Sequence, residues 1–293
     1  MSWVFIAIAG YFLNAVAILV DKFLLTKRIG EPVTYTFFVS ILSLLVLALW
    51  PFNYVKPSFE LLAYAFPAGL AFAAGLFFLF TALHSNDASR IGPLVGGLTT
   101  MFALFFSILI LNDQLVFKEF IGIFFLVAGS IVLAFSFKGI FKLNLWPALT
   151  AAFFFGLSAV LTKYLFLRTS FITGLVLTRL GTASGGFLLL LVPSAVKAIK
   201  TEWQGSRRPL SLTFVLGQSA GALAAILISY AISLANVSVV TALQGLQHVF
   251  IFLLAVFLSY FTPKIISEEL SSKILALKIL SIILISLGLV FVV

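Results

Sequence analysis

The chain has 293 residues, of which 62% are hydrophobic and 9% charged, and its mean hydropathy is +1.24. No soluble domain of this length can bury so much apolar surface, so the composition places the chain in a lipid bilayer. The net charge of +9 does not indicate nucleic-acid binding, because the basic residues lie in short loops between apolar runs. The absence of cysteine excludes disulfides and thiolate metal sites.

Apolar runs that can cross the membrane follow one another along the whole chain. A spanning helix needs about 20 apolar residues, and ten runs meet that length: 3–21, 33–52, 61–83, 91–111, 118–137, 144–166, 171–193, 211–234, 237–261 and 274–293. No basic segment precedes the first run, so we expect a retained helix rather than a cleaved signal peptide. The segment 194–210 is basic and is expected to be a solvated loop.

The pattern of the chain occurs twice. Residues 15–27 and 156–168 agree in apolar character at a shift of 141, and residues 82–111 and 231–260 agree at a shift of 149. Each copy contains five apolar runs, and a unit with an odd number of spans reverses its direction when it is repeated. We therefore predict an all-α integral membrane protein of ten transmembrane helices, built as two inverted five-helix repeats at 1–137 and 144–293.

The positive charges predict an orientation. Twelve Lys and Arg residues fall in the loops that follow odd-numbered helices and four in the loops that follow even-numbered ones. Since basic loops face the cytoplasm, the count predicts both termini on the extracytoplasmic side of the cell (inner) membrane.

Arg179 is the most costly polar residue within a predicted span. It lies about 12 Å into its helix at 1.5 Å per residue, and a charge at that depth normally faces the bundle interior or a wet cavity. Two interpretations stay open. Arg179 binds an anionic group or acts as a gating charge, or it caps backbone carbonyls near an unwound region made by Gly181, Gly185 and Gly186.

The densest polar stripe lies in the ninth run. Gln244, Gln247 and His248 stand at i, i+3 and i+4, so they share one helix face, which predicts a cavity lining. The alternative is a set of hydrogen bonds between helices. His248 has an unperturbed pKa near neutrality and is the first candidate for proton coupling, against a neutral hydrogen-bonding role.

Three further residues complete the predicted substrate site. Tyr11 and Asn14 form a smaller i, i+3 pair on the first helix, and Gln218 lies in the small-residue stretch GQSAGALAA. Such stretches let helices approach closely, so the glutamine needs a partner across the bundle. Asp21 beside Lys22 is either a gating ion pair or, as we favour, a helix-end pair at the headgroups.

The sequence offers no enzyme chemistry. Two histidines far apart and the absence of cysteine make no metal cluster, and no glycine-rich phosphate loop precedes a helix. No cofactor is expected. The expected partners are a small-molecule substrate and the lipid bilayer but no nucleic acid, and the chain is expected to be a monomer, with a homodimer as the alternative.

Residues 63–135 resemble the EamA domain of the drug/metabolite transporter superfamily. The resemblance rests on Ala82-Leu83, the turn Asp87-Ala88-Ser89, Pro93, Asp113 with Lys118, and Gly129. The second half repeats the pattern with Ala231, Ser238, Glu268-Glu269 and Gly288.

The resemblance implies a ten-helix carrier whose central cavity is lined by helices 1, 3, 4, 6, 8 and 9, with helices 2 and 7 as moving gates. It also implies cytoplasmic termini, against the charge count. The first helix is similar to that of small multidrug resistance proteins, but Asn14 stands where those carry a glutamate.

Two functions stay open. In the first, the chain is a secondary transporter that moves a small polar or amphipathic metabolite by alternating access. In the second, it is a flippase of a lipid-linked intermediate, or a membrane scaffold of the same fold.

Overall fold

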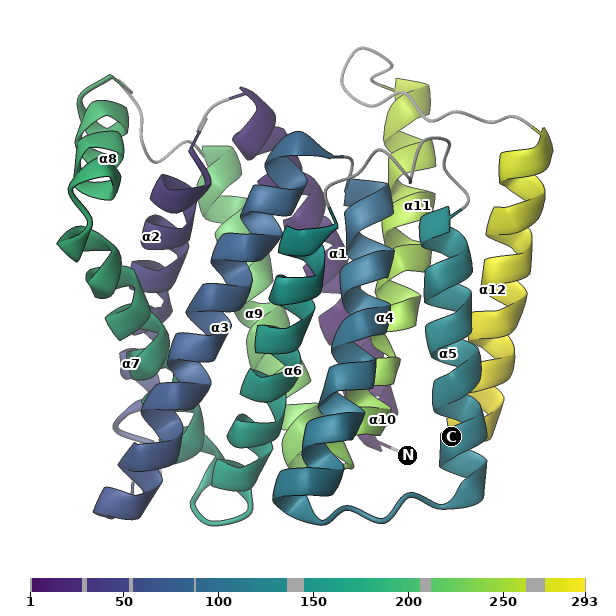
Figure 1. Ribbon diagram of the computed structural model, residues 1–293, viewed down its shortest axis with the longest axis horizontal. Coiled ribbons are helices and arrows are strands. Elements are labelled where there is room, and N and C mark those ends of the chain that lie inside the picture. The colour runs from purple at the N-terminus through teal and green to yellow at the C-terminus, as the bar shows by residue number, and fades with distance from the viewer. Residues whose placement is uncertain are drawn as a thin grey trace.

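The computed structural model describes residues 2–27, 31–52, 55–86, 88–135, 145–205, 212–261 and 272–292, and this part of the chain is a bundle of helices (Figure 1). The first half contains α1 (Ser2–Lys27), α2 (Pro32–Leu42), η1 (Ser43–Leu49), α3 (Phe59–Ser85), α4 (Ala88–Phe106), η2 (Ser107–Leu111) and α5 (Phe117–Phe135). The second half contains α6 (Trp146–Phe166), α7 (Phe171–Leu188), η4 (Leu189–Leu191), α8 (Pro193–Gly205), α9 (Leu212–Leu234), α10 (Val237–Ala242), α11 (Gln244–Phe261) and α12 (Ser272–Val292).

Nine helical segments among the described residues are long and apolar enough to cross a membrane. The expected class, an all-α multi-pass membrane protein, is therefore confirmed. The tenth predicted run corresponds to α12, in which the apolar stretch Ile279–Phe291 is shorter than the other nine segments. The predicted boundary between the repeats, 137–144, lies outside the described residues.

Two predicted elements differ from the structure. The segment 194–210 is not a loop throughout, because Pro193–Gly205 forms the helix α8. Its small and apolar residues Ala195 and Ile199 are buried while Lys197 and Lys200 are exposed, so the polar composition concealed an amphipathic helix. The run 237–261 is divided at Leu243 into α10 and α11.

Small residues bring pairs of helices together. A Cβ added at Gly69 of α3 would overlap the backbone of Thr178 and Thr182 on α7, and one at Gly181 would lie 2.9 Å from the Ala65 carbonyl oxygen. A Cβ added at Gly217 of α9 would overlap the Val20 side chain of α1. Close packing of this kind replaces the hydrophobic driving force that helices lack in lipid.

The helices run nearly parallel to one another, and both chain ends lie at the lower end of the bundle in Figure 1. α1, α3 and α7 rise from the lower end toward the upper end, while α9 descends. The two strongest lateral pairings are α1 with α9 and α5 with α12. This arrangement leaves a central space that is surrounded by α1, α3, α4, α6, α7, α9, α10 and α11.

Candidate functional site

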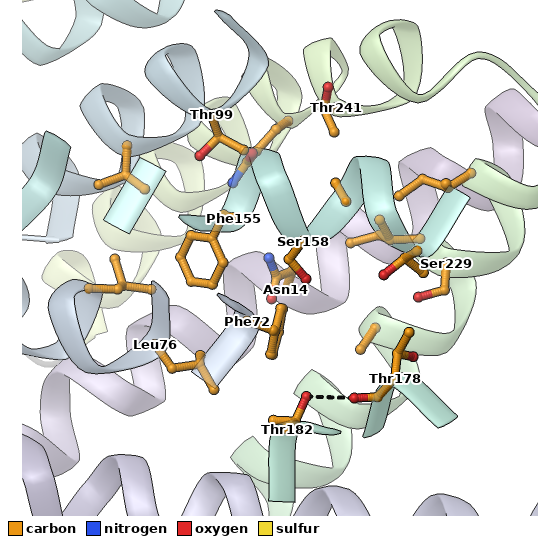
Figure 2. Close-up of a pocket in the computed structure, with 18 of the residues that line it drawn as sticks. Asn14, Phe72, Leu76, Thr99, Phe155, Ser158, Thr178, Thr182, Ser229 and Thr241 are labelled. Atoms are coloured by element: carbon orange, nitrogen blue, oxygen red, sulfur yellow. Dashed lines mark hydrogen bonds between the residues drawn. The ribbon is translucent and has the colours of Figure 1, made fainter. Parts of the chain in front are cut away.

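A cavity of about 220 Å³ lies in the centre of the bundle. Its wall is formed by α1, α3, α4, α6, α7, α9, α10 and α11. The wall therefore includes all the helices that the family resemblance implies, with the expected helices 8 and 9 corresponding to α9 and to α10–α11. It also includes α7, because Arg179, Thr178 and Thr182 line the same cavity. The wall is mostly apolar, with Phe72, Leu76, Phe80 and Phe155 between its polar groups (Figure 2).

One face of α1 lines the cavity over about ten residues of the helix. Tyr11, Asn14, Ile18 and Asp21 all line it, and their spacing places them on a single helical face. The distance from Tyr11 to Asp21 along the axis is about 15 Å at 1.5 Å per residue. The cavity therefore extends from the lower half of the bundle toward the upper ends of α1 and α2.

Arg179 supplies a positive charge to the cavity wall. Its guanidinium carbon lies 4.7 Å from the centroid of the Phe72 ring, a cation–π contact. No hydrogen bond or ion pair joins the guanidinium to the described residues. The unwound region considered in the sequence analysis is not present, because α7 is a continuous helix from Phe171 to Leu188. The glycines that follow Arg179 let α3 approach instead.

The amide side chains of α11 face α1 across the cavity. Gln244 and Gln247 line it, and Asn14 donates from Nδ2 to Gln247 Oε1 at 2.7 Å. Gln247 is fully buried, and its Nε2 has no hydrogen-bond partner in the described structure. That amide group is therefore a buried hydrogen-bond donor without a partner among the described residues.

His248 lies apart from the other predicted site residues. It is buried, and neither ring nitrogen has a hydrogen-bond partner in the described part of the chain. Its ring packs against α4, where a Cβ added at Gly96 would overlap Nε2 and lie 3.1 Å from Cε1. His248 is not among the residues that line the cavity. Successive residues of a helix point about 100° apart, so His248 of α11 turns toward α4 while Gln247 faces the cavity.

Tyr11 and Gln218 take different positions around the cavity. Tyr11 lines it and donates to the Val240 carbonyl oxygen at 2.8 Å. Gln218 is not a lining residue, but its Nε2 donates to Asp21 Oδ1 and to the Tyr35 hydroxyl, both at 3.0 Å. The partner that this glutamine required is therefore Asp21 of α1.

Asp21 is a cavity residue that the predicted substrate site did not include. It lines the cavity and is the last residue of the first candidate span. The predicted pair with Lys22 falls outside the side chains that the structure describes. Tyr35 donates a short hydrogen bond to the same Oδ1 that accepts from Gln218. Tyr35 is fully buried between Phe80 and Phe214. No signal in the sequence separates this aspartate from an ordinary helix-end residue.

Hydroxyl groups form most of the remaining polar surface. Figure 2 shows Ser158, Thr178, Thr182, Ser229 and Thr241 around the cavity. Thr178 and Thr182 donate to helix carbonyl oxygens within α7. Their hydroxyls therefore offer the cavity mainly acceptor lone pairs.

A separate polar cluster holds the lower end of α9. Lys163 Nζ donates to the carbonyl oxygens of Ile232, Ser233 and Ala235 at 2.8, 3.2 and 2.9 Å. Asn236 donates to Asp113 Oδ2 nearby at 3.2 Å. Burial raises the pKa of the Asp113 carboxyl above its ordinary value, although the charge of Lys163 acts in the opposite direction.

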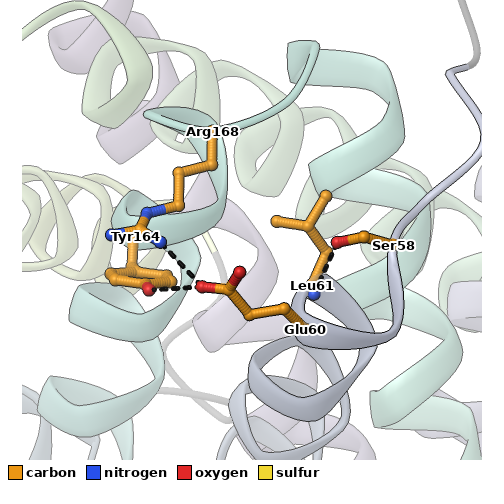
Figure 3. Close-up of polar contacts among 5 residues, drawn as sticks. All are labelled: Ser58, Glu60, Leu61, Tyr164 and Arg168. Carbon is orange, nitrogen blue, oxygen red and sulfur yellow. Dashed lines mark hydrogen bonds and ion pairs between the residues drawn. The ribbon is translucent and has the colours of Figure 1, made fainter.

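An exposed ion pair lies outside the cavity. Arg168 donates to Glu60 Oε1 at 2.8 Å, and Tyr164 donates to the same oxygen at 3.2 Å (Figure 3). Ser58 caps the α3 helix that carries Glu60. These side chains are matched controls for the charged residues of the cavity.

Metal chemistry has no support from the described residues, among which no group of three or more His, Asp or Glu side chains could hold a metal ion.

Comparisons with known proteins agree on one architecture. Residues 1–135 match the sequence model of the EamA-like transporter family. A protein of known crystal structure aligns with 96% of this chain and 97% of its own length, with a TM-score of 0.62 and 16% identity. That likeness shows the fold alone. No curated protein matches the sequence.

Proposed function

We propose that the protein is a secondary carrier. The ground is the match of residues 1–135 to the EamA-like transporter family, a domain of the drug/metabolite transporter superfamily. The carrier moves a small polar or amphipathic solute across the membrane by alternating access. The two halves, 1–137 and 144–293, are inverted five-helix repeats that rock around the central cavity. α12 completes the second repeat as its fifth span.

The single observation that carries this proposal is the position of Arg179. A charged group in a membrane span is costly and is retained where it meets a partner or a solute. Arg179 lines the central cavity without an ion-pair partner in the described structure and stacks on Phe72. An anionic group of the solute is the missing partner.

The cavity also favours a carrier over the flippase considered in the sequence analysis. A flippase that uses Arg179 requires that residue at a lateral opening toward lipid. Arg179 instead shares one central cavity with Asn14 of α1 and Gln247 of α11, on the far side of the bundle. Within this proposal, Arg179 binds the anionic group while Asn14, Gln244 and Gln247 orient the solute through hydrogen bonds, near Tyr11.

The proposal is tested in two steps with purified protein. A thermal-shift screen of amino acids, nucleosides, sugars and amines identifies the solute that stabilises the fold. Counterflow of that solute into proteoliposomes is then measured for wild type, Arg179→Gln and the matched control Arg168→Gln. We expect Arg179→Gln to lose at least tenfold in uptake and Arg168→Gln to transport normally. Equal uptake by the two variants would remove Arg179 from the site.

We further propose the orientation that follows from the charge count, with both termini extracytoplasmic. Single cysteines are introduced at Ser2 and Ser206 and labelled in intact cells with a membrane-impermeant maleimide. Labelling at position 2 and protection at position 206 is the expected result. The opposite pattern would establish cytoplasmic termini.

A further inference from the structure

The cavity carries charges of both signs, at different depths. Arg179 contacts the ring of Phe72. Asp21 binds Tyr35, whose ring lies 4.7 Å from that of Phe80. Phe72 and Phe80 are both on α3, eight residues apart, which corresponds to about 12 Å along the helix axis. Along the axis of α3, the two charged groups are therefore offset by roughly that distance.

The Asp21 carboxylate is oriented by two neutral hydrogen-bond donors, Tyr35 and Gln218. Oδ1 accepts from Tyr35 and Gln218, which fixes the orientation of the carboxylate. Among the side chains that the structure describes, which do not include that of Lys22, none donates to Oδ2 and no cation forms an ion pair with the group. Because Tyr35 and Gln218 are uncharged, the negative charge of Asp21 is not neutralised by them.

The wall between the two charged groups is apolar. Ile18, Leu76 and Leu79 line this part of the cavity together with Phe80 and Val95. A solute that lies between Asp21 and Arg179 therefore contacts hydrocarbon and aromatic surface along its middle. Such a wall rejects a solute that is polar throughout, because the wall cannot replace the lost hydrogen bonds to water.

We propose that Asp21 is a second charged subsite of the cavity, which binds a cationic ammonium group at the opposite end of the solute from Arg179. The substrate class is an extended dipolar molecule with an anionic end, an apolar middle and a cationic end. This inference rests on the proposed carrier function and names the substrate class of the same site.

The geometry sets the length of the solute. Contacts of a carboxylate with Arg179 and of an ammonium with Asp21 together occupy about 7 Å of the 12 Å separation, at ordinary hydrogen-bond distances. About 5 Å along the axis is left between the two charged groups of the solute, and the lateral distance between α1 and α7 adds to this length. 6-Aminohexanoate, whose extended chain of bonds of about 1.5 Å advances about 1.25 Å per bond and so spans about 7.5 Å, is long enough to meet both groups.

The test uses binding to the purified full-length protein in detergent, measured by calorimetry. The probes are 6-aminohexanoate, hexanoate and hexylamine, with 3-aminopropanoate as the short control. Wild type is expected to bind 6-aminohexanoate at least tenfold more tightly than any of the other three, since a charge-assisted hydrogen bond contributes about one to two powers of ten in affinity.

Variants assign each end of the probe. In Asp21→Asn the advantage of 6-aminohexanoate over hexanoate should vanish, while hexanoate itself binds as in wild type. In Arg179→Gln the advantage over hexylamine should vanish instead. Glu60→Gln removes a carboxylate from the surface pair of Figure 3 and should leave all affinities unchanged. Size-exclusion profiles establish that each variant is folded.

Two results would overturn the subsite. The first is equal affinity of wild type for hexanoate and 6-aminohexanoate, which needs no variant. The second is that Asp21→Asn still binds 6-aminohexanoate more tightly than hexanoate. That result would overturn the subsite even if the same variant removed a pH dependence of transport, because Asp21 would then bind a proton and not the ammonium group. Failure of the carrier function is distinct, since it appears as absent counterflow of every solute found by the thermal-shift screen.

Discussion

Gly181→Ala tests whether the contact between α3 and α7 sets the position of Arg179. A Cβ at Gly181 would lie 2.9 Å from the Ala65 carbonyl oxygen and 3.0 Å from both Gly69 Cα and the Phe66 carbonyl oxygen. All three atoms belong to backbone, so no side chain can rotate away. Ordinary contact begins near 3.4 Å, and the two helices must therefore separate by about 0.5 Å.

The expected magnitude follows from two opposing effects. Overpacking of a tight interface costs about 1–3 kcal/mol, whereas alanine favours a helix over glycine by about 1 kcal/mol. The net loss for Gly181→Ala is thus up to about 2 kcal/mol, toward the upper end of that range because all three contacts are with backbone atoms. The matched control is Gly221→Ala on α9, where the added Cβ meets only Ala17 Cβ at 3.4 Å. That variant should keep or slightly gain stability.

Thermal unfolding of both variants in the same detergent measures the difference, and counterflow measures its effect on transport. Gly181→Ala should unfold several degrees below wild type and transport more slowly, because Arg179 lies half a turn away on the same helix. Equal melting temperatures for Gly181→Ala and Gly221→Ala would refute the argument that this glycine is required by the helix contact.

Three other predictions concern charged and buried groups. Lys163→Met should destabilise the fold by about 3 kcal/mol, because three carbonyl oxygens lose a charged donor. Lys197→Met, at an exposed position of α8, should have no effect in the same thermal assay. The raised pKa of Asp113 means that its ionisation opposes folding, so stability from this group falls as pH rises from the ordinary carboxyl pKa through the raised value. Asp113→Asn should remove that fall when melting temperature is compared with wild type across pH, and parallel profiles would contradict it. Gly96→Ala should lower the melting temperature, because the added Cβ overlaps the His248 ring. The double variant Gly96→Ala, His248→Ala should regain the melting temperature of His248→Ala alone. Additive losses would show that the two sites are independent.

Much of the architecture could be predicted from sequence because hydrophobic length is a direct consequence of bilayer thickness. The small-residue stretch of α9 could also be recognised, because small residues let helices approach closely. In the structure Gly217 packs on Val20 of α1. α8 could not be recognised, because a short amphipathic helix at a membrane surface has the composition of a loop. Asp21 was left out of the predicted substrate site because its contacts are with Tyr35 and Gln218, which are far from it in sequence or on other helices.

The site residues were predicted unevenly for a related reason. Gln244 and Gln247 reach the cavity, whereas His248, one residue further, packs on α4. All three residues belong to the continuous helix α11, and an i, i+3, i+4 spacing spreads them over about 100° of its circumference. Whether the outermost of them reaches the cavity depends on how the helix is rotated against α4, which the sequence pattern does not give. Arg179 was identified without knowledge of any neighbour, since its cost in a membrane span alone marks it.

Hydrogen bonds near both ends of α9 determine how far this helix can tilt. Three hydrogen bonds from Lys163 fix the lower end at Ile232, whereas the upper end is held through Gln218 on Asp21 and Tyr35. The arm between Gln218 and Ile232 is about 21 Å long at 1.5 Å per residue. A tilt of about 10° at the fixed end therefore displaces Gln218 by about 4 Å, which exceeds the reach of a hydrogen bond. The carboxylate that we assign to the cationic end of the solute is thus the same group that keeps this helix from tilting.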